Sequence, residues 1–287
     1  MHEVRPSTKA LGSSYFAEFR RGVMHPKKNE ARSLNLLAHF KEPLLPASLD
    51  RFNKLTIEEQ RIYIAAMGGV ERMKSIREQG FPIPRDFKET NLDHVQDALG
   101  IAREYYEKFP RLSEFIEFPV VQDDLIVHDI AESNIAIDDR TPVNRTAQDE
   151  KAKRLEPYAG IRFLRRISDP EQREYWKDIY VKHNLKDPNN LNVQMAVFID
   201  KAQGTTRAAE IAFNTHNVSD EATFIKMRLH LWETIPRMME PAMNLLIGLP
   251  TQESREDMRK IVMHELGFLE RYGPKDIVRT IKKGFAA

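Results

Sequence analysis

Two pairs of a carboxylate and a histidine have a spacing that places both side chains on one face of a helix. Asp124 and His128 are four residues apart, and His230 and Glu233 are three apart. Carboxylate oxygens and imidazole nitrogens are ligands for divalent metals, and the same groups transfer protons. In a chain with 9 histidines and 30% charged residues, such pairs also arise by chance. We retain the four residues as weak candidates for a site and predict neither a metal nor a cofactor from them.

The local motifs that mark common enzyme classes are absent from the sequence. No histidine follows a glutamate by three positions, which excludes the di-iron pattern of helical bundles. His264-Glu265 lacks the second histidine of a His-Glu-x-x-His zinc site, and there is no Walker A loop, Gly-x-Ser-x-Gly elbow or EF-hand loop. The chain has no cysteine, so it has no disulfide, thiol nucleophile or cysteine-ligated metal. These absences favour a non-enzymatic protein.

Signals for helices dominate the part of the chain that would have to position any site. Thr56 to Glu59 fits a capping box, which predicts a helix from Thr56 to Gln79 that ends at Gly80. A second helix is predicted to begin near Asn91 and to end at Pro110. Its apolar stripe has alternating spacings of three and four residues and comprises Leu92, Val95, Leu99, Ala102, Tyr106 and Phe109.

The remaining pattern predicts an all-α fold, an irregular bundle of about nine or ten helices with an extended basic N-terminal arm. Further helices are expected over 29–40, 146–155, 220–235, 236–247, 252–272 and 274–283, and one after Ser168-Asp169-Pro170-Glu171. Residues 191–199 alternate like a strand, but we favour a helix because no second strand is visible to pair with it. We expect residues 1–55 to be the arm with one short helix and 56–287 to be a single helical domain. Residues 138–146 are the best candidate for an internal boundary.

The net charge of +1 hides a strong segregation of charge along the chain. Residues 1–41 carry a net +5, residues 86–139 carry −10 and residues 271–287 carry +4. The basic ends could fold back on the acidic helices, could meet partners, or could be solvated surfaces without a role. As partners we expect other protein subunits, and we do not favour anionic lipid or RNA. The candidate contact residues are Tyr15, Phe16, Phe19, Arg20, Arg21, Lys27, Lys28, Lys282 and Lys283.

From these features we expect a non-enzymatic accessory subunit of a large assembly. No stretch reaches the roughly 18 apolar residues of a membrane helix. Helices with basic arms are typical of mitochondrial complexes, such as a respiratory or ATP synthase complex, and of ribosomes, so we favour a mitochondrial location over a cytoplasmic one. The N-terminal segment is read as a surface arm, with a targeting segment as the other interpretation. The alternative function is a helical enzyme or ligand-binding protein whose carboxylate and histidine site is formed by distant residues.

Overall fold

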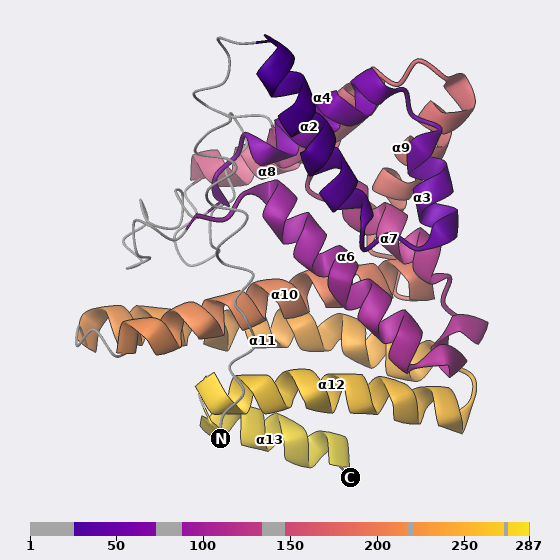
Figure 1. Ribbon diagram of the computed structural model, residues 1–287. Helices are drawn as coiled ribbons and strands as arrows, with labels where there is room; N and C mark the ends of the chain where they lie inside the picture. Colours follow the sequence, from indigo (N-terminus) through magenta and orange to yellow (C-terminus); the bar gives the residue numbers. More distant parts are fainter. Residues whose placement is uncertain (1–25, 73–87, 134–146, 217–220, 273–274, 287) are drawn as a thin grey trace, which may run out of the picture.

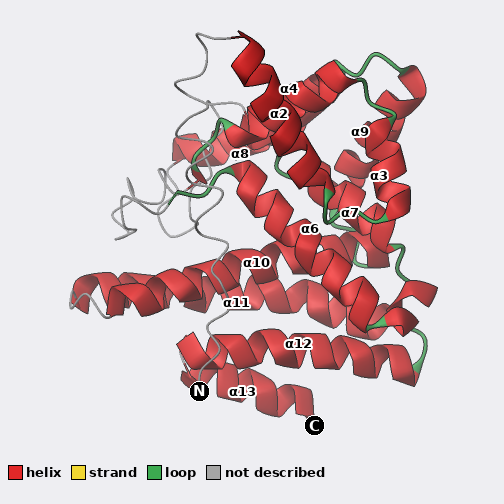
Figure 2. Ribbon diagram, in the orientation of Figure 1, coloured by secondary structure: helices red, strands yellow, loops and turns green. Residues whose placement is uncertain are grey.

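Helices account for almost all of the secondary structure (Figure 2). The computed structural model describes residues 26–72, 88–133, 147–216, 221–272 and 275–286. Within these ranges there are 11 α-helices and no strand, apart from an isolated antiparallel bridge between Glu71 and Thr90. The predicted all-α fold is therefore confirmed. None of the described helices combines the length and the hydropathy needed to cross a bilayer.

Two groups of helices meet along a shared core (Figure 1). The first group comprises α2 (Pro26–Lys41), α3 (Pro46–Asn53), α4 (Ile57–Gly68), α6 (Asn91–Lys108), α7 (Phe118–Val127), α8 (Ala147–Leu164) and α9 (Pro170–Leu185), with two short 3₁₀ helices, η2 (Pro110–Glu114) and η3 (Ile130–Ser133). The second group comprises α10 (Leu191–His216), α11 (Glu221–Gly248), α12 (Gln252–Tyr272) and α13 (Lys275–Ala286). These last four helices lie side by side, and α6 and α7 pack against α10 to join the groups.

Helix α7 is the central element of the fold. It contacts α3, α6, α9 and α10, and from Val121 to Val127 every side chain is buried. Its buried polar side chains are satisfied by other elements: Gln122 accepts a hydrogen bond from the backbone N–H of Leu45, and Asp123 accepts hydrogen bonds from Ser48 and Tyr175. Buried polar groups with such partners fix one orientation of a helix. The residues at the end of α7 are therefore held in a defined position.

Residues 26–55, which the sequence assigned to the arm, contribute to the core. Phe40 of α2 and Phe52 of α3 are fully buried, and their rings contact each other and Tyr63 of α4 at centroid distances of 5.4–5.9 Å. The predicted short helix over 29–40 is confirmed as α2. The remainder of the arm and residues 138–146, the candidate boundary, lie outside the described residues.

Three predicted helix limits are wrong. One helix ends at a pair of glycines that it was expected to pass, and two helices continue through prolines. Helix α4 begins with the predicted capping box at Thr56 but ends at Gly68, because two glycines weaken the helix and the chain then turns to pair with residues before α6. Helix α8 continues through Pro157 to Leu164, and α11 continues through Pro236. A proline inside a helix costs about 3 kcal/mol; the long buried face of α11 offsets this cost, and α8 is held beyond its proline by the buried residues Gly160 and Leu164.

Two further expectations concern which side chains a helix buries. Residues 191–199 do form the start of α10, and most of them are buried, so their alternation did not reflect a half-exposed strand. In α6 the predicted stripe is correct up to Ala102, but the structure buries Tyr105 and exposes Tyr106. The hydroxyl of Tyr105 donates to Glu265 of α12 at 2.8 Å, a contact between distant residues that spacing alone does not reveal.

Replacing Gly160 by alanine should destabilise the protein. Gly160 is a buried residue of α8, and an added Cβ would overlap the ring carbon Cζ and the hydroxyl oxygen of Tyr180 on α9. The Tyr180 ring is buried, and its hydroxyl donates a hydrogen bond to the carbonyl oxygen of Glu156, so the side chain has little freedom to move. We expect a loss of about 1–3 kcal/mol in the free energy of unfolding, measured by urea denaturation.

Gly100→Ala on α6 is the matched control for this prediction. An added Cβ at Gly100 meets no atom within 4 Å, so the higher helix propensity of alanine should stabilise the protein by about 1 kcal/mol. Equal effects at the two positions would contradict the close packing of α8 on α9.

Candidate metal centre

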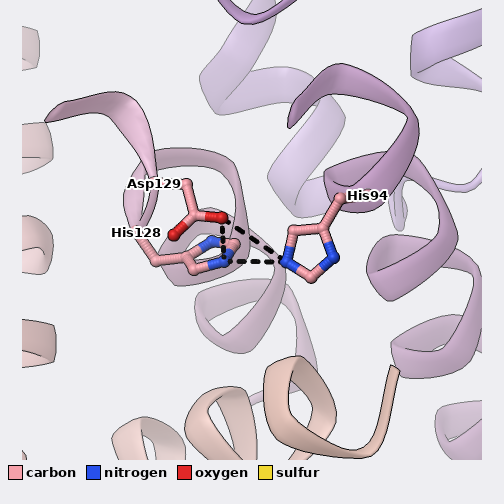
Figure 3. A group of neighbouring side chains, drawn as sticks. All are labelled: His94, His128 and Asp129. Carbon is pink, nitrogen blue, oxygen red and sulfur yellow. Dashed lines mark hydrogen bonds and ion pairs between the residues drawn. The ribbon is translucent and has the colours of Figure 1, made fainter. Parts of the chain in front are cut away.

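Four buried or nearly buried side chains converge where α6, α7 and α10 meet. His94 lies in the first turn of α6, Asp200 lies in α10, and His128 and Asp129 lie at the junction between α7 and η3. Figure 3 shows His94, His128 and Asp129 directed toward one another. The potential ligand atoms of these three residues all lie within 4.8 Å of each other.

The distances between the donor atoms are short and similar. The two Nε2 atoms of His94 and His128 are 3.3 Å apart. Oδ1 of Asp200 lies 3.1 Å from Nε2 of His94 and 3.6 Å from Nε2 of His128. Oδ2 of Asp129 lies 3.5 Å and 3.2 Å from the same two nitrogens. Ligands bound at 2.0–2.2 Å to a tetrahedral ion are roughly 3.3–3.6 Å apart, and cis ligands of an octahedral ion are roughly 2.8–3.1 Å apart. The cluster therefore has the dimensions of a metal coordination sphere.

The other ring nitrogen of each histidine is held by an oxygen acceptor. Nδ1 of His94 lies 2.6 Å from Oε1 of Gln203, and Nδ1 of His128 lies 2.8 Å from the carbonyl oxygen of Leu125. Because both oxygens only accept, each Nδ1 must carry the proton and donate it. In the neutral ring this leaves the Nε2 lone pair directed into the cluster. Such outer hydrogen bonds are typical of metal-binding histidines.

The charges in the cluster attract a cation. Burial opposes a charge on His128, but Asp129 and Asp200 outweigh this effect and hold the pKa of His128 well above its ordinary value. Burial likewise opposes ionisation of Asp129, yet His128 and Arg72 keep its pKa far below the usual range. The pKa of Asp200 is also depressed, because Lys201 and the histidines outweigh desolvation. The two carboxylates therefore stay ionised, and they favour a positive charge between the two imidazoles.

Local structure fixes the elements that carry these ligands. A capping box between Thr90 and Asp93 begins α6 and sets the first turn that contains His94. The backbone N–H of His128 donates to the carbonyl of Asp124 at 2.9 Å, so His128 still belongs to the last turn of α7. Arg51 of α3 forms an ion pair with Asp123, which ties α7 to a third helix. The ligands are thus placed by helix ends that are themselves anchored.

Lysines and further acids from α8, α9, α10 and η3 border the cluster. Nζ of Lys201 lies 2.5 Å from Oδ2 of Asp200, on the oxygen that does not face the histidines. Nζ of Lys153 lies 2.6 Å from Glu156 and 3.8 Å from Glu132 of η3. Burial lowers the pKa of Lys186, which follows the end of α9. The ammonium group of Lys201 lowers it further, and that of Lys153 has a smaller effect in the same direction. The ammonium groups of Lys201 and Lys153 therefore lie near enough to Lys186 to disfavour its charged form.

The structure brings one of the four sequence candidates into the cluster. His128 is a member, whereas Asp124 is not among the converging residues, and its carboxylate lies 2.7 Å from Nδ1 of His183 on α9. The rings of His128 and His183 are adjacent, with centroids 5.5 Å apart, so Asp124 belongs to the surroundings of the centre. His230 and Glu233 lie on α11 and are not among the described residues that converge there.

The residues expected to contact partners are only partly described. Lys282 of α13 lies 2.5 Å from Glu270 of α12, and Lys283 is exposed. Lys27 and Lys28 fall within α2, but their side chains lie outside the described part of the structure. The same is true of the whole of the aromatic and arginine group, which comprises Tyr15, Phe16, Phe19, Arg20 and Arg21.

Sequence reasoning missed His94, Asp129 and Asp200. The sequence candidates were pairs on one helix face, whereas His128 and Asp129 are adjacent residues at a helix end, and the other two ligands lie on different helices. A signal was present in the His-Asp dipeptide that follows α7, the most apolar of the helices that the structure describes. Comparison of the chain with protein-family models, curated proteins and solved structures found no match.

Proposed function

We propose that the protein is a divalent-metal-dependent hydrolase that cleaves phosphoesters. The observation that carries this proposal is the convergence of His94, His128, Asp129 and Asp200 at the separations of a coordination sphere. Two imidazoles and two carboxylates suit Mn²⁺, Fe²⁺, Co²⁺ or Zn²⁺. This is the alternative class expected from the sequence, a helical enzyme with a site formed by distant residues. Four protein ligands on an octahedral ion would leave two positions for water and substrate.

The charge around the centre supports an anionic substrate. Lys153 of α8 and Lys201 of α10 lie near enough to Lys186, which follows α9, to lower its pKa. Lys201 pairs with Asp200 of the cluster and Lys153 pairs with Glu156, and a phosphate group carries negative charge that both a metal and lysines stabilise. An uncharged ester or amide offers no negative charge to these ammonium groups. We therefore favour a phosphoester over a carboxylic ester or a peptide.

An ion held by His94, His128, Asp129 and Asp200 would lower the pKa of a water molecule, so that hydroxide would be available to attack phosphorus. The new P–O bond forms as the ester P–O bond breaks, and the leaving alkoxide takes up a proton to become an alcohol. Glu132 is the candidate acceptor of the proton from water. It is buried on η3, three residues after Asp129, and it lies 3.4 Å from Asn91, one helical turn before His94.

The test is hydrolysis by protein that has been stripped with a chelator and reloaded with single metals. p-Nitrophenyl phosphate and bis(p-nitrophenyl) phosphate serve as phosphoesters, and p-nitrophenyl acetate serves as the uncharged ester. We expect Mn²⁺, Co²⁺ or Zn²⁺ to restore hydrolysis of a phosphoester, and acetate hydrolysis to stay at the level of Asp129→Asn. A loaded protein that hydrolyses neither phosphoester, or only the acetate, would contradict the proposal.

A further inference from the structure

One face of α11 carries large apolar side chains that the described part of the chain leaves open. Ile225, Leu229 and Trp232 are 50%, 53% and 56% exposed. The apolar series continues at Pro236 and Met243, which are exposed, and at Met239, which is only 8% exposed, so the spacings are four, three, four, three and four. On a helix this spacing forms one continuous stripe. Contiguous exposed apolar surface of this kind marks an interaction site.

The two halves of this stripe differ in shape. The first half projects, together with the end of α10, beyond the ends of α12 and α13 (Figure 1). The second half lines a groove of about 890 Å³ that α12 and α13 also border. Its apolar lining from α11 comprises Pro236, Met239, Met243, Leu246 and Ile247. One helix therefore presents a ridge at Ile225, Leu229 and Trp232, followed by a groove.

We infer that a second copy of this chain covers this face, with the two α11 helices antiparallel about a two-fold axis near Thr234. The spacing of the stripe is the same in both directions, so this rotation places apolar residues opposite one another. Ile225 would face the partner's Met243, and Leu229 would face the partner's Met239. The ridge of each copy would enter the groove of the other, which satisfies the self-complementarity that a two-fold interface requires.

The charges beside the stripe match the same arrangement. Glu233, Arg237 and Glu240 lie on one flank of the stripe and alternate in sign. The rotation about Thr234 places Arg237 opposite the partner's Leu231. The partner's Glu233 lies two residues further along its helix, so the two charged residues are offset by about 3 Å along the helix axis. This pairing occurs twice in the dimer. Opposite charges at the rim of an interface fix its register and orientation.

The stripe extends along most of α11. From Ile225 to Met243 it spans about 27 Å of helix at a rise of 1.5 Å per residue. Each copy would contribute both a ridge and a groove, so every large apolar side chain of the stripe would be covered. The inference does not depend on the proposed hydrolase activity.

The first test is the mass of the full chain in solution, measured by analytical ultracentrifugation at micromolar concentrations. We expect twice the 33.4 kDa chain mass. Leu229→Lys, at an exposed position, should raise the dissociation constant by roughly 30-fold or more while leaving the circular dichroism spectrum unchanged. Leu185→Lys, at a more exposed leucine on α9, is the control and should remain dimeric. A monomeric wild-type chain, or a Leu229→Lys variant as dimeric as the wild type, would overturn the inference.

The second test concerns the register. Glu233→Arg and Arg237→Glu should each weaken the dimer, because each puts two like charges opposite each other. The double variant restores opposite charges and should regain most of the affinity. Single variants that dimerise as tightly as the wild type, or a double variant weaker than both, would overturn the antiparallel arrangement.

Discussion

Replacing His94 by alanine should leave the purified protein without a bound divalent ion and lower phosphoester hydrolysis by about 10³-fold or more, a loss near 4 kcal/mol of transition-state stabilisation. His94 supplies one of the two converging nitrogens, and its Nε2 lies within 3.5 Å of three other donor atoms. Without it, two carboxylates and one imidazole would hold the ion less tightly. Metal content by inductively coupled plasma mass spectrometry and affinity by titration calorimetry would measure the effect.

Two variants show whether the loss is specific to the coordination sphere. Gln203→Leu removes the acceptor of the Nδ1 proton of His94 and should weaken metal affinity by about 10- to 100-fold without abolishing it. His264→Ala removes an exposed histidine of α12 and should leave the affinity unchanged. Affinity in the wild type should fall as pH is lowered, because protons compete for the same nitrogens. Stoichiometric metal in the purified His94→Ala protein would contradict the assignment.

The fold could be predicted from sequence where a helix is defined by local chemistry. The hydroxyl and carboxylate of Thr56 and Glu59 form the predicted capping box, and Asp169 caps α9 ahead of Pro170. Tertiary packing decides the remaining limits. Pro157 stays inside α8 because the turn of α8 that follows it packs against α9, where Gly160 contacts Tyr180. No local pattern contains that contact.

The candidate site was largely beyond sequence reasoning for a related physical reason. Its ligands come from three helices, and 106 residues separate His94 from Asp200. Only the crossing of α6 and α10 brings these two together. Each ligand taken alone resembles a solvated or core polar residue. The Glu-x-x-His pattern describes ligands along one helix, whereas this cluster uses a helix start, a helix end and a helix interior.

Replacing Glu132 by glutamine should lower kcat for phosphoester hydrolysis by about 10²- to 10⁴-fold while the metal stays bound. The amide keeps the shape of the side chain and a hydrogen-bonding oxygen, but it cannot accept the proton that water loses. Glu132 is not among the converging donor atoms, so the metal content should equal that of the wild type. Paired measurements of kcat and bound metal would therefore separate proton transfer from metal binding.

Glu156→Gln is the matched control for this prediction. Glu156 is another buried acid, and it lies closer to Lys153 than Glu132 does, at 2.6 Å against 3.8 Å. If the effect of Glu132→Gln came only from a displaced Lys153, then Glu156→Gln should reduce kcat at least as much. We expect instead a much smaller loss, because Glu156 lies on α8, whereas Glu132 lies on η3, three residues after Asp129. Equal losses in the two variants would assign Glu132 a role in positioning Lys153 and leave the proton acceptor to another group.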